Sequence, residues 1–367
     1  MSNRIHKPKD CINDRYEIIS YIGEGGMQEV FRARDLVLER EVALKVPKNS
    51  SAEKRFQRSA IVSAKVNHPN VAKTLDYFKI DSYEYLIEEL IVGRDLKTVI
   101  QSEFKCIDPY LVARVFHHLA KGLAASHHAN VIHRDLKPSN VMVGVGVSLS
   151  ELKITDFGIA KMAEDEISQA VEGGEQTMSA SKTVVGALPY MAPETIEIEN
   201  FANFASDIWS LGAMAYELLS GKKPFGEGVG FYKTIVAINE AAPPQKPIWI
   251  EENSQFQSIG SSVYDVILSC LQKDSSLRPT ADELVSRCES FCYSTVERKL
   301  GKFKNFNRGR TNQGFIQSED GSNVFFHFDS VYGEKPVIGS KVSFAEFLGN
   351  PVNRAHPVVV MRDSENV

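Results

Sequence analysis

The chain has 367 residues, which allows one large domain with a small one, or two domains of medium size. Hydrophobic residues make up 43% of it, which is enough for a packed core. The formal net charge of -5 excludes a strongly basic chain and gives no overall reason to expect nucleic-acid binding, although a local basic patch could still provide it.

The five cysteines form an odd and scattered set, which argues against a disulfide framework and predicts a reducing compartment. The first ten residues contain no apolar core of signal-peptide length. No apolar run reaches the roughly 18 residues that a membrane span needs. We therefore expect a cytoplasmic protein that makes no contact with a membrane.

Two strands separated by glycines open the chain. Residues 16–22 alternate as a strand does, residues 23–26 read Gly-Glu-Gly-Gly, and a second strand follows. Glycines at such a place let backbone N–H groups approach phosphates, although a plain hairpin turn explains the loop equally well when it is taken alone. The next strand, residues 42–45, carries one inward lysine, Lys45, and the combination is much more specific than the loop.

Further elements follow from the spacing of apolar residues. Residues 52–66 place Phe56, Ala60 and Ala64 four apart and predict an amphipathic helix. Residues 108–130 predict a long helix, because an apolar stripe recurs there at helical period: Leu111, Val112, Val115, Phe116, Leu119 and Leu123.

The most specific stretch of the chain runs from residue 131 to residue 158. It contains His-Arg-Asp-Leu-Lys-Pro-Ser-Asn at 133–140 and Lys-Ile-Thr-Asp-Phe-Gly at 153–158. Apolar runs flank the polar residues, so we expect Asp135, Asn140 and Asp156 to lie on loops held by short buried strands. One carboxylate could accept a proton from an attacking hydroxyl, while the amide oxygen and the other carboxylate suit Mg²⁺.

This stretch resembles the catalytic core of the eukaryotic-type (bacterial Hanks-type) serine/threonine protein kinases, and the resemblance covers about residues 14–292. It implies an α+β chain with the bilobal protein kinase fold, in which a β-rich N-lobe (14–92) precedes a helical C-lobe (93–292). It also implies ATP and Mg²⁺ as cofactors and protein substrates that are phosphorylated on serine or threonine.

The resemblance implies a role for each matched residue. Asp135 would be the catalytic base, and Lys137 would stabilise the transferring phosphoryl group. Asn140 and Asp156 would hold Mg²⁺. Glu89 and Ile91 would contribute backbone groups to an ATP site formed by Ile22, Gly23, Gly25, Val30, Ala43, Lys45, Glu89, Ile91 and Met142. Structural ties are implied from Asp207 to the catalytic loop, and between Glu194 and Arg278.

Two departures from the family pattern concern the lysine. The third glycine of the loop is Gln28, whose side chain would lie where the loop covers the phosphates. The helix glutamate that pairs with the strand lysine in this family falls on Ser59. We therefore expect Lys45 to be oriented by Asp156 alone, or by an acid elsewhere in the sequence.

Two more departures lie at the back of the pocket and in the docking loop. Glu88 stands where the family usually has a bulky apolar residue, so either this carboxylate has a partner or the alignment is off by one residue. The docking-loop threonine falls on Ala187, which removes a hydroxyl hydrogen bond. The departures at Ser59, Gln28 and Ala187 keep open a second hypothesis, a pseudokinase that acts as a nucleotide-responsive scaffold.

Residues 159–185 resemble an activation segment, because they are polar and rich in serine and threonine. The resemblance implies that a phosphate there would pair with Arg134 and order the loop. We predict autophosphorylation, possible in trans within a dimer, at Thr177, Ser179, Ser181 or Thr183. The alternative is a serine- and threonine-rich loop without a regulatory role.

A different pattern begins near residue 299. Short alternating segments joined by Gly and Asp turns predict a small five-stranded antiparallel β-barrel over residues 299–362. Their order and spacing resemble a cold-shock domain, an OB-type barrel, through Gly-Phe-Ile at 314–316 and Val-Phe-Phe-His-Phe at 324–328. The linker near residues 293–300 is too short to decide whether this barrel touches the kinase part.

The second resemblance implies binding of single-stranded RNA or DNA. Bases would stack on aromatic side chains and phosphates would meet basic ones, with Lys304, Phe306, Phe315, Phe325, His327 and Phe328 as the candidates. Two aromatic positions of the family are Asn305 and Gln313 here. The alternative is therefore a barrel with a structural role or a protein contact.

Overall fold

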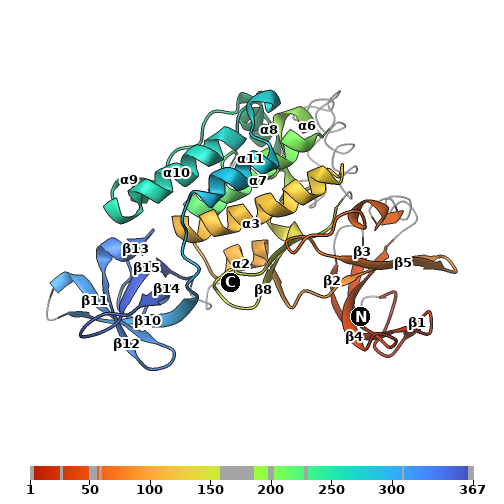
Figure 1. Cartoon of the computed structure of the whole chain (residues 1–367), viewed down its shortest axis with the longest axis horizontal. Helices are drawn as coiled ribbons and strands as arrows, with labels where there is room; N and C mark the ends of the chain where they lie inside the picture. Colours follow the sequence, from red (N-terminus) through yellow and green to blue (C-terminus); the bar gives the residue numbers. More distant parts are fainter. Residues whose placement is uncertain are drawn as a thin grey trace.

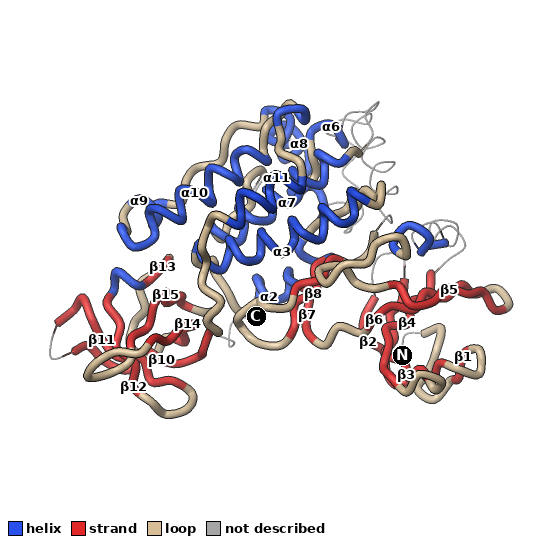
Figure 2. The backbone as a smooth tube through the Cα atoms, in the orientation of Figure 1, coloured by secondary structure: helices blue, strands red, loops and turns tan. Residues whose placement is uncertain are grey.

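The computed structural model describes residues 4–24, 28–48, 56–57, 60–157, 186–196, 202–226, 230–307 and 310–362. Three bodies follow one another along the chain: a β-rich N-lobe, a helical C-lobe and a β-barrel (Figure 1). The barrel and the N-lobe lie at opposite ends of the C-lobe, which separates most of the strands into two groups (Figure 2). No helix within the described ranges is both long and apolar enough to cross a lipid bilayer.

The N-lobe is a six-stranded sheet in which every neighbouring pair is antiparallel. In sheet order its strands are β1 (Cys11–Ile12), β2 (Tyr16–Glu24), β3 (Gln28–Asp35), β4 (Arg40–Pro47), β6 (Tyr83–Glu89) and β5 (Thr74–Ile80). One face buries a core that includes Ile18, Phe31 and Leu44. Because side chains alternate across a strand, Lys45 and Leu86 point to the opposite face.

The predicted helix of residues 52–66 is only partly described. Residues 56–57 and 60–63 are helical, and Phe56 and Ala60 pack against Leu86 of β6. This arrangement agrees with the apolar spacing of the sequence. Ser59, the position aligned with the family's helix glutamate, lies outside the described residues.

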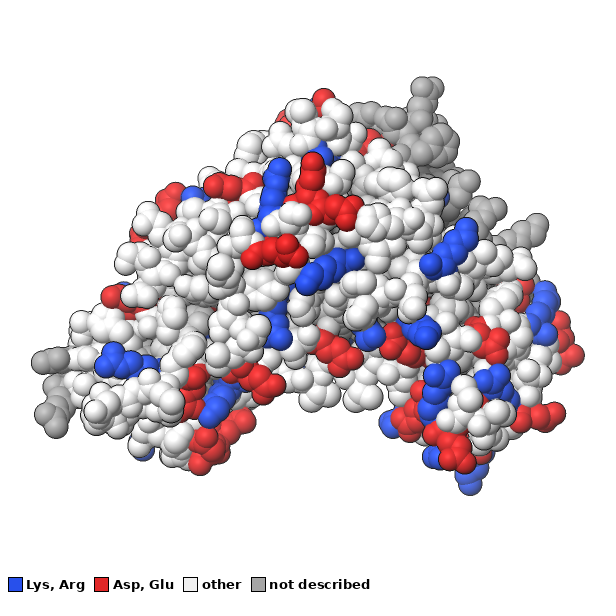
Figure 3. Space-filling view, in the orientation of Figure 1, with Lys and Arg blue, Asp and Glu red and all other residues white. Residues whose placement is uncertain are grey.

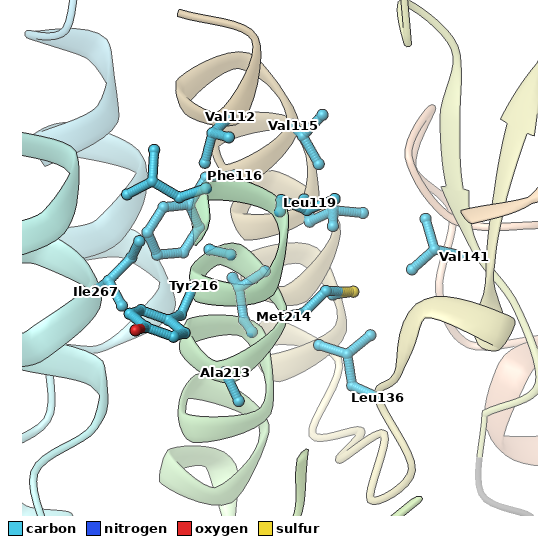
Figure 4. Packing of buried hydrophobic residues seen from close by; sticks show 14 of the residues in the cluster. Val112, Val115, Phe116, Leu119, Leu136, Val141, Ala213, Met214, Tyr216 and Ile267 are labelled. Atoms are coloured by element: carbon cyan, nitrogen blue, oxygen red, sulfur yellow. The ribbon is translucent and has the colours of Figure 1, made fainter. Parts of the chain in front are cut away.

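The C-lobe is built around α3 (Pro109–His128), α7 (Phe204–Ser220) and α10 (Ser254–Cys270), whose apolar faces meet in one core (Figure 4). All six residues of the apolar stripe predicted for α3 are buried. Asp108 caps α3 by accepting a hydrogen bond from the backbone N–H of Leu111. The other α-helices of its described residues are α2 (Leu96–Ser102), α6 (Pro193–Ile196), α8 (Phe231–Glu240), α9 (Ile248–Glu251) and α11 (Ala281–Glu289).

A small sheet connects the lobes and carries the loops of the predicted site. Its order is β7 (Gly93–Asp95), β8 (Val141–Gly144) and β9 (Leu152–Ile154). A Cβ atom at residue 93 would lie 1.8 Å from the carbonyl oxygen of Val143, so only glycine allows β7 to approach β8 this closely. The close pairing of β7 with β8 therefore fixes the position of the inter-lobe connection relative to the catalytic loop.

The C-terminal barrel has five longer strands and one short one. They are β10 (Arg298–Asn307), β11 (Arg310–Ser318), β12 (Asn323–His327), β13 (Val331–Tyr332), β14 (Lys341–Phe347) and β15 (Arg354–Val360). Four pairings are antiparallel, as predicted, and a parallel contact between β12 and β15 closes the barrel. Phe303, Phe326 and Phe344 fill its interior.

The barrel packs directly on the C-lobe. Tyr332, which is fully buried, donates a hydrogen bond of 2.9 Å from its hydroxyl to the carbonyl oxygen of Leu219. Arg298 forms an ion pair of 2.9 Å with Asp108 at the start of α3, and both side chains are buried. His356 stacks on Phe256 of α10 with ring centroids 5.5 Å apart. The barrel and the C-lobe therefore share one interface, which answers the question that the short linker left open.

Candidate active site

One buried carboxylate from α7 holds the loop of residues 131–140. Asp207 accepts hydrogen bonds of 2.9 Å from the backbone N–H groups of His133 and Arg134. Arg134 has a positive φ of 69°, a conformation that non-glycine residues adopt at some cost, and these hydrogen bonds stabilise it. The tie predicted for Asp207 is confirmed.

The polar residues of this loop converge on Asp135. Lys137 Nζ lies 2.9 Å and 2.7 Å from the two carboxylate oxygens of Asp135. Asn140 Nδ2 donates to the Asp135 carbonyl oxygen at 2.7 Å and to its Oδ2 at 3.0 Å. The three side chains therefore form one hydrogen-bonded group, with the amide oxygen of Asn140 directed away from the carboxylate that its nitrogen contacts.

The loop after β9 is tied to the same group. Thr155 donates from its backbone N–H (2.9 Å) and its hydroxyl (3.2 Å) to the carbonyl oxygen of Asn140. Asp156 follows with a positive φ of 61°. Such strained backbone concentrates at functional sites, where the surroundings enforce it. Because Thr155 is bound to Asn140 and Asp156 is the next residue, Asp156 lies beside the cluster of Asp135, Lys137 and Asn140.

Lys45 extends from the N-lobe to Asp156. Its Nζ lies 2.8 Å from Asp156 Oδ1 and 2.6 Å from Glu88 Oε2. Gln28 also reaches Asp156, because its Nε2 donates to Oδ1 at 2.9 Å. Glu88 therefore has a partner in Lys45, which is the first of the two alternatives that the sequence left open. The sequence reasoning marked both Glu88 and Gln28 as departures, and it did not find that they contact this lysine–aspartate pair.

The ionisation of these buried groups is coupled. Burial by itself would lower the pKa of Lys45, but the negative charges of Asp156 and Glu88 outweigh burial and raise the pKa. Burial would likewise raise the pKa of Asp156, yet Lys45 and the hydrogen bond from Gln28 hold it below its ordinary value. For Glu88, burial dominates and raises the pKa despite Lys45. At neutral pH we expect a lysine cation facing an aspartate anion.

The N-lobe residues predicted for the ATP site lie on neighbouring strands. Gly23 of β2 is opposite Val30 of β3, and Ala43 of β4 is buried beside them in the sheet. Met142 is half-buried on β8, which belongs to the small sheet between the lobes. Ile22 is 51% exposed, and Gly25 lies outside the described residues.

The connection between the lobes follows β6. The side chain of Glu89 binds Lys153 and accepts a hydrogen bond of 2.8 Å from the backbone N–H of Lys73. Within the described residues no hydrogen bond uses the backbone of Ile91, so its N–H and C=O groups are available to a ligand. This is the arrangement that a nucleobase bound by backbone groups requires.

The docking-loop region shows the other predicted tie. Glu194 forms a two-pronged ion pair with Arg278, at 2.7 Å and 2.8 Å. Ala187 is buried, and its methyl side chain cannot replace the hydrogen bond of the threonine hydroxyl. The four predicted phosphorylation sites, Thr177, Ser179, Ser181 and Thr183, lie outside the described residues.

The structure separates the aromatic residues predicted for the barrel into two groups. Phe315 and Phe325 are opposite one another on β11 and β12, with ring centroids 5.8 Å apart, and His327 is opposite Gln313 on the same face. Phe306 and Phe328, in contrast, stack on each other and pack against the interior residue Phe303. The second group therefore packs against the interior residue Phe303 instead of joining the first group on one surface.

Basic side chains near this barrel are partly neutralised. Lys299 binds Glu346 at 2.5 Å, and Lys304 lies 3.4 Å from the side-chain oxygen of Asn323. The Arg354 guanidinium lies 5.9 Å from the ring centre of Phe325. Acidic and basic residues are interspersed over the barrel on the face shown in Figure 3, which carries no broad basic surface.

Comparison with known proteins identifies the fold and the family. The model of the protein kinase domain family matches residues 16–288. A probable serine/threonine-protein kinase of Clostridium perfringens is 32% identical over 285 residues, which are 76% of this chain and 38% of that protein. Serine/threonine-protein kinase PrkC of Bacillus subtilis is 30% identical over 268 residues, 72% of this chain and 38% of PrkC.

A crystal structure of Rad53 with AMP-PNP superimposes with a TM-score of 0.58 and 23% identity, over 74% of this chain and 64% of that one, which establishes the fold. The chain spans about two fifths of the length of these curated relatives. The matched region extends from β2 to the end of α11 and includes both acidic loops described above. On this evidence the chain is a member of the protein kinase domain family, and its curated relatives are serine/threonine-protein kinases.

Proposed function

We propose that this chain transfers the terminal phosphoryl group of ATP to serine or threonine residues of proteins. The observation that carries the proposal is the convergence of two groups. Lys45 and Asp156 form an ion pair of 2.8 Å across the two lobes, and Thr155 links their loop to the cluster of Asp135, Lys137 and Asn140. The family membership and the serine/threonine-protein kinase relatives support the same reaction.

The oxygen donors fit Mg²⁺. A carboxylate from Asp156 and the amide oxygen of Asn140 are hard ligands of the kind that this ion prefers, and the remaining ligands would be phosphates and water. Bound there, the ion would neutralise phosphate charge. Lys45 and Gln28 now occupy Asp156 Oδ1, so binding of the metal–nucleotide complex has to compete with both hydrogen bonds at that oxygen.

Each residue of the site would then have a separate role. Lys45 would hold phosphate oxygens, and Ile91 would contact the base through its free backbone groups. Asp135 would accept the proton of the substrate hydroxyl, while Lys137, already 2.7 Å away, would face the transferring phosphoryl group. Because this chemistry depends on placement and charge neutralisation, losing one of these groups should lower the rate by several orders of magnitude.

Incubation of the purified chain with radiolabelled ATP, Mg²⁺ and a general serine/threonine substrate tests the proposal. We expect label on the substrate, and also on residues 159–185 of the chain itself, with faster self-labelling at higher protein concentration if two copies phosphorylate one another in trans. Asp135→Ala should abolish both while leaving the melting temperature close to that of wild type. Absence of transfer by a folded wild type that still binds ATP would favour the pseudokinase hypothesis.

A second function concerns the barrel, and we propose that its outer face binds single-stranded nucleic acid. Phe315 and Phe325 lie side by side on that face, with the Arg354 guanidinium beside the Phe325 ring. Aromatic rings and an arginine together suit stacked bases and their phosphates. The strands β11 and β12 lie on the side of the barrel away from the C-lobe helices (Figure 1), and Phe315 and Phe325 are partly exposed there.

Fluorescence titration with labelled single-stranded RNA and DNA at two salt concentrations tests this second proposal. We expect Phe315→Ala to weaken binding by about tenfold, since stacking contributes about 1–3 kcal/mol per base. Leu348→Ala, at a 93% exposed position of the same barrel, is the matched control and should change nothing. If wild type shows no binding even at low salt, the barrel has a structural role or contacts a protein.

A further inference from the structure

Glu88 is a charged residue in a place where charge is costly. It is 4% exposed at the end of β6, and its carboxylate lies 2.6 Å from the ammonium group of Lys45. A buried carboxylate without a partner would destabilise the fold, so this residue is tolerated only because of the lysine. The family usually has a bulky apolar side chain at this position, and such a side chain would pack there without any partner.

The sheet brings the two groups together. Strands β4 and β6 are hydrogen-bonded neighbours, with Lys45 opposite Leu86 and Ala43 opposite Glu88. Lys45 and Glu88 are therefore diagonal neighbours on one face of the sheet, a separation that two long side chains can bridge. Because adjacent strands supply both residues, formation of the sheet is sufficient to bring them within contact distance.

Lys45 also contacts Asp156, which belongs to the other lobe. The lysine thus has two carboxylate partners, one from each lobe. Glu88 is fixed in the same sheet as the lysine, whereas Asp156 lies on a loop of the C-lobe and would turn to Mg²⁺ when nucleotide binds. After that change Glu88 is the carboxylate left to fix the direction of the ammonium group.

We propose that Glu88 is the positioning residue of Lys45, and that it supplies from the neighbouring strand the carboxylate that the family otherwise takes from a helix. The inference rests on the proposed kinase function. Its consequence is that the lysine is oriented by the sheet itself, so the lysine–carboxylate pair does not depend on the position of the helical residues 56–57 and 60–63. The two carboxylates also keep Lys45 protonated in a buried site.

Three substitutions test the proposal. Glu88→Gln removes the charge and keeps the shape, and we expect kcat/KM for ATP to fall on the order of a hundredfold, as for a displaced catalytic group. Glu88→Met restores an apolar side chain and should fold at least as well as wild type, yet lose similar activity. Glu84→Gln is the matched control on the same strand, where Glu84 is also buried and lies 3.6 Å from the surface residue Lys79, and it should leave kcat/KM unchanged.

Nucleotide binding separates positioning from a merely structural role. We expect Glu88→Gln to weaken binding of Mg–AMP-PNP in calorimetry by about tenfold, but to cause no further weakening in a Lys45→Ala background, because Glu88 acts through the lysine. Equal losses in both backgrounds would overturn the proposal, and so would wild-type kcat/KM or a higher rate in a folded Glu88→Met variant. Since binding needs no turnover, this cycle also tests the inference if the wild type transfers no phosphate.

Discussion

Asp156 Oδ1 accepts two hydrogen bonds, one from Lys45 at 2.8 Å and one from Gln28 at 2.9 Å. Gln28 is buried, and its own amide oxygen has no hydrogen-bond partner within the described residues. The side chain is thus held at the site by a single bond to a carboxylate. A hydrogen bond to a charged group contributes about 1.5–3 kcal/mol, so this contact competes measurably with any ligand of that oxygen.

We therefore predict that Gln28→Gly binds Mg–AMP-PNP about tenfold more tightly than wild type, because the competitor for Asp156 is removed. Calorimetric titration at fixed Mg²⁺ measures this. Glu24→Gln, at the end of β2, serves as the control, since Glu24 is 59% exposed and pairs with Lys48 instead of Asp156. Weaker binding by Gln28→Gly would mean that the glutamine contacts the nucleotide instead of excluding it.

At the scale of residues, the sequence identified most of the site residues but not the contacts of Glu88 with Lys45 and of Gln28 with Asp156. Asp135, Asn140 and Asp156 lie in a contiguous and specific string, so their convergence could be predicted. Glu88 could be recognised only as a misplaced charge, because its partner depends on the register of β4 against β6. That register follows from cross-strand hydrogen bonding, which a one-dimensional pattern of apolar residues does not define.

Among the elements, the strand pair β7–β8 depends on one glycine. A Cβ atom at residue 93 would lie 1.8 Å from the Val143 carbonyl oxygen. Because that oxygen belongs to the backbone of β8, the clash can be relieved only if β7 or β8 moves. We predict that Gly93→Ala displaces the connection from Met142 and raises KM for ATP several-fold, with a smaller change in kcat. Gly230→Ala, at an open position before α8 where φ is -70°, should have less effect on KM. Similar KM values for both variants would show that this approach does not set the adenine site.

A second element-level feature is the pair between Glu194 of α6 and Arg278. Burial would raise the pKa of Glu194, but the hydrogen bonds and charge of Arg278 outweigh it and hold the pKa below its ordinary value of about 4.5. A depressed carboxyl pKa contributes stability that is fully present above the unfolded-state pKa and is lost as pH falls through the folded-state pKa. The pair therefore stabilises the C-lobe at neutral pH and loses this effect in acid.

We predict that Glu194→Gln lowers stability by about 3 kcal/mol at pH 7, where the wild-type pair is ionised. The difference in melting temperature between wild type and this variant should shrink steadily below about pH 4.5. Glu240→Gln, at the exposed end of α8, should show a small difference that does not change with pH. A difference for Glu194→Gln that is equally large at pH 7 and pH 3.5 would contradict the assignment.

Elements were more predictable than contacts between them. The apolar stripe of α3 and the alternation in β10–β15 come from local periodicity, which is encoded within each segment. The separation of Phe306 from Phe315 was not predictable in the same way. A register shift between Phe303 and Asn305 places Phe306 opposite Gly314 and against the ring of Phe303, and such a bulge leaves no clear mark in the sequence.

For the whole molecule, the interface between barrel and C-lobe joins residues that are far apart in the chain. Arg298 and Asp108 are 190 positions apart, and Tyr332 donates to a carbonyl 113 positions away. Neither contact has a local signature, since an arginine beside a strand and an aspartate before a helix are both ordinary surface features. The core of the C-lobe nevertheless continues into Tyr332, Val359 and Met361. The barrel therefore covers apolar surface that the C-lobe would otherwise expose.

This continuity predicts that the C-lobe and the barrel unfold together. Arg298→Ala would leave the Asp108 carboxylate buried beside the start of α3 without its ion pair, at a cost of about 3–5 kcal/mol. Lys299→Ala is the matched control one residue away, because Lys299 is 46% exposed and its pair with Glu346 should contribute less than about 1 kcal/mol. Trp249, whose ring lies 6.1 Å from that of Tyr332, reports the interface by fluorescence.

Urea unfolding followed by this fluorescence and by far-ultraviolet circular dichroism distinguishes the outcomes. Coincident transitions that move together to lower urea in Arg298→Ala, but not in Lys299→Ala, are expected if the interface couples the two bodies. Two separate transitions in wild type would mean that the barrel folds independently of its contacts. In that case the loss of Asp108 pairing would shift only the C-lobe transition, and ligands of the barrel could not influence the active site through this interface.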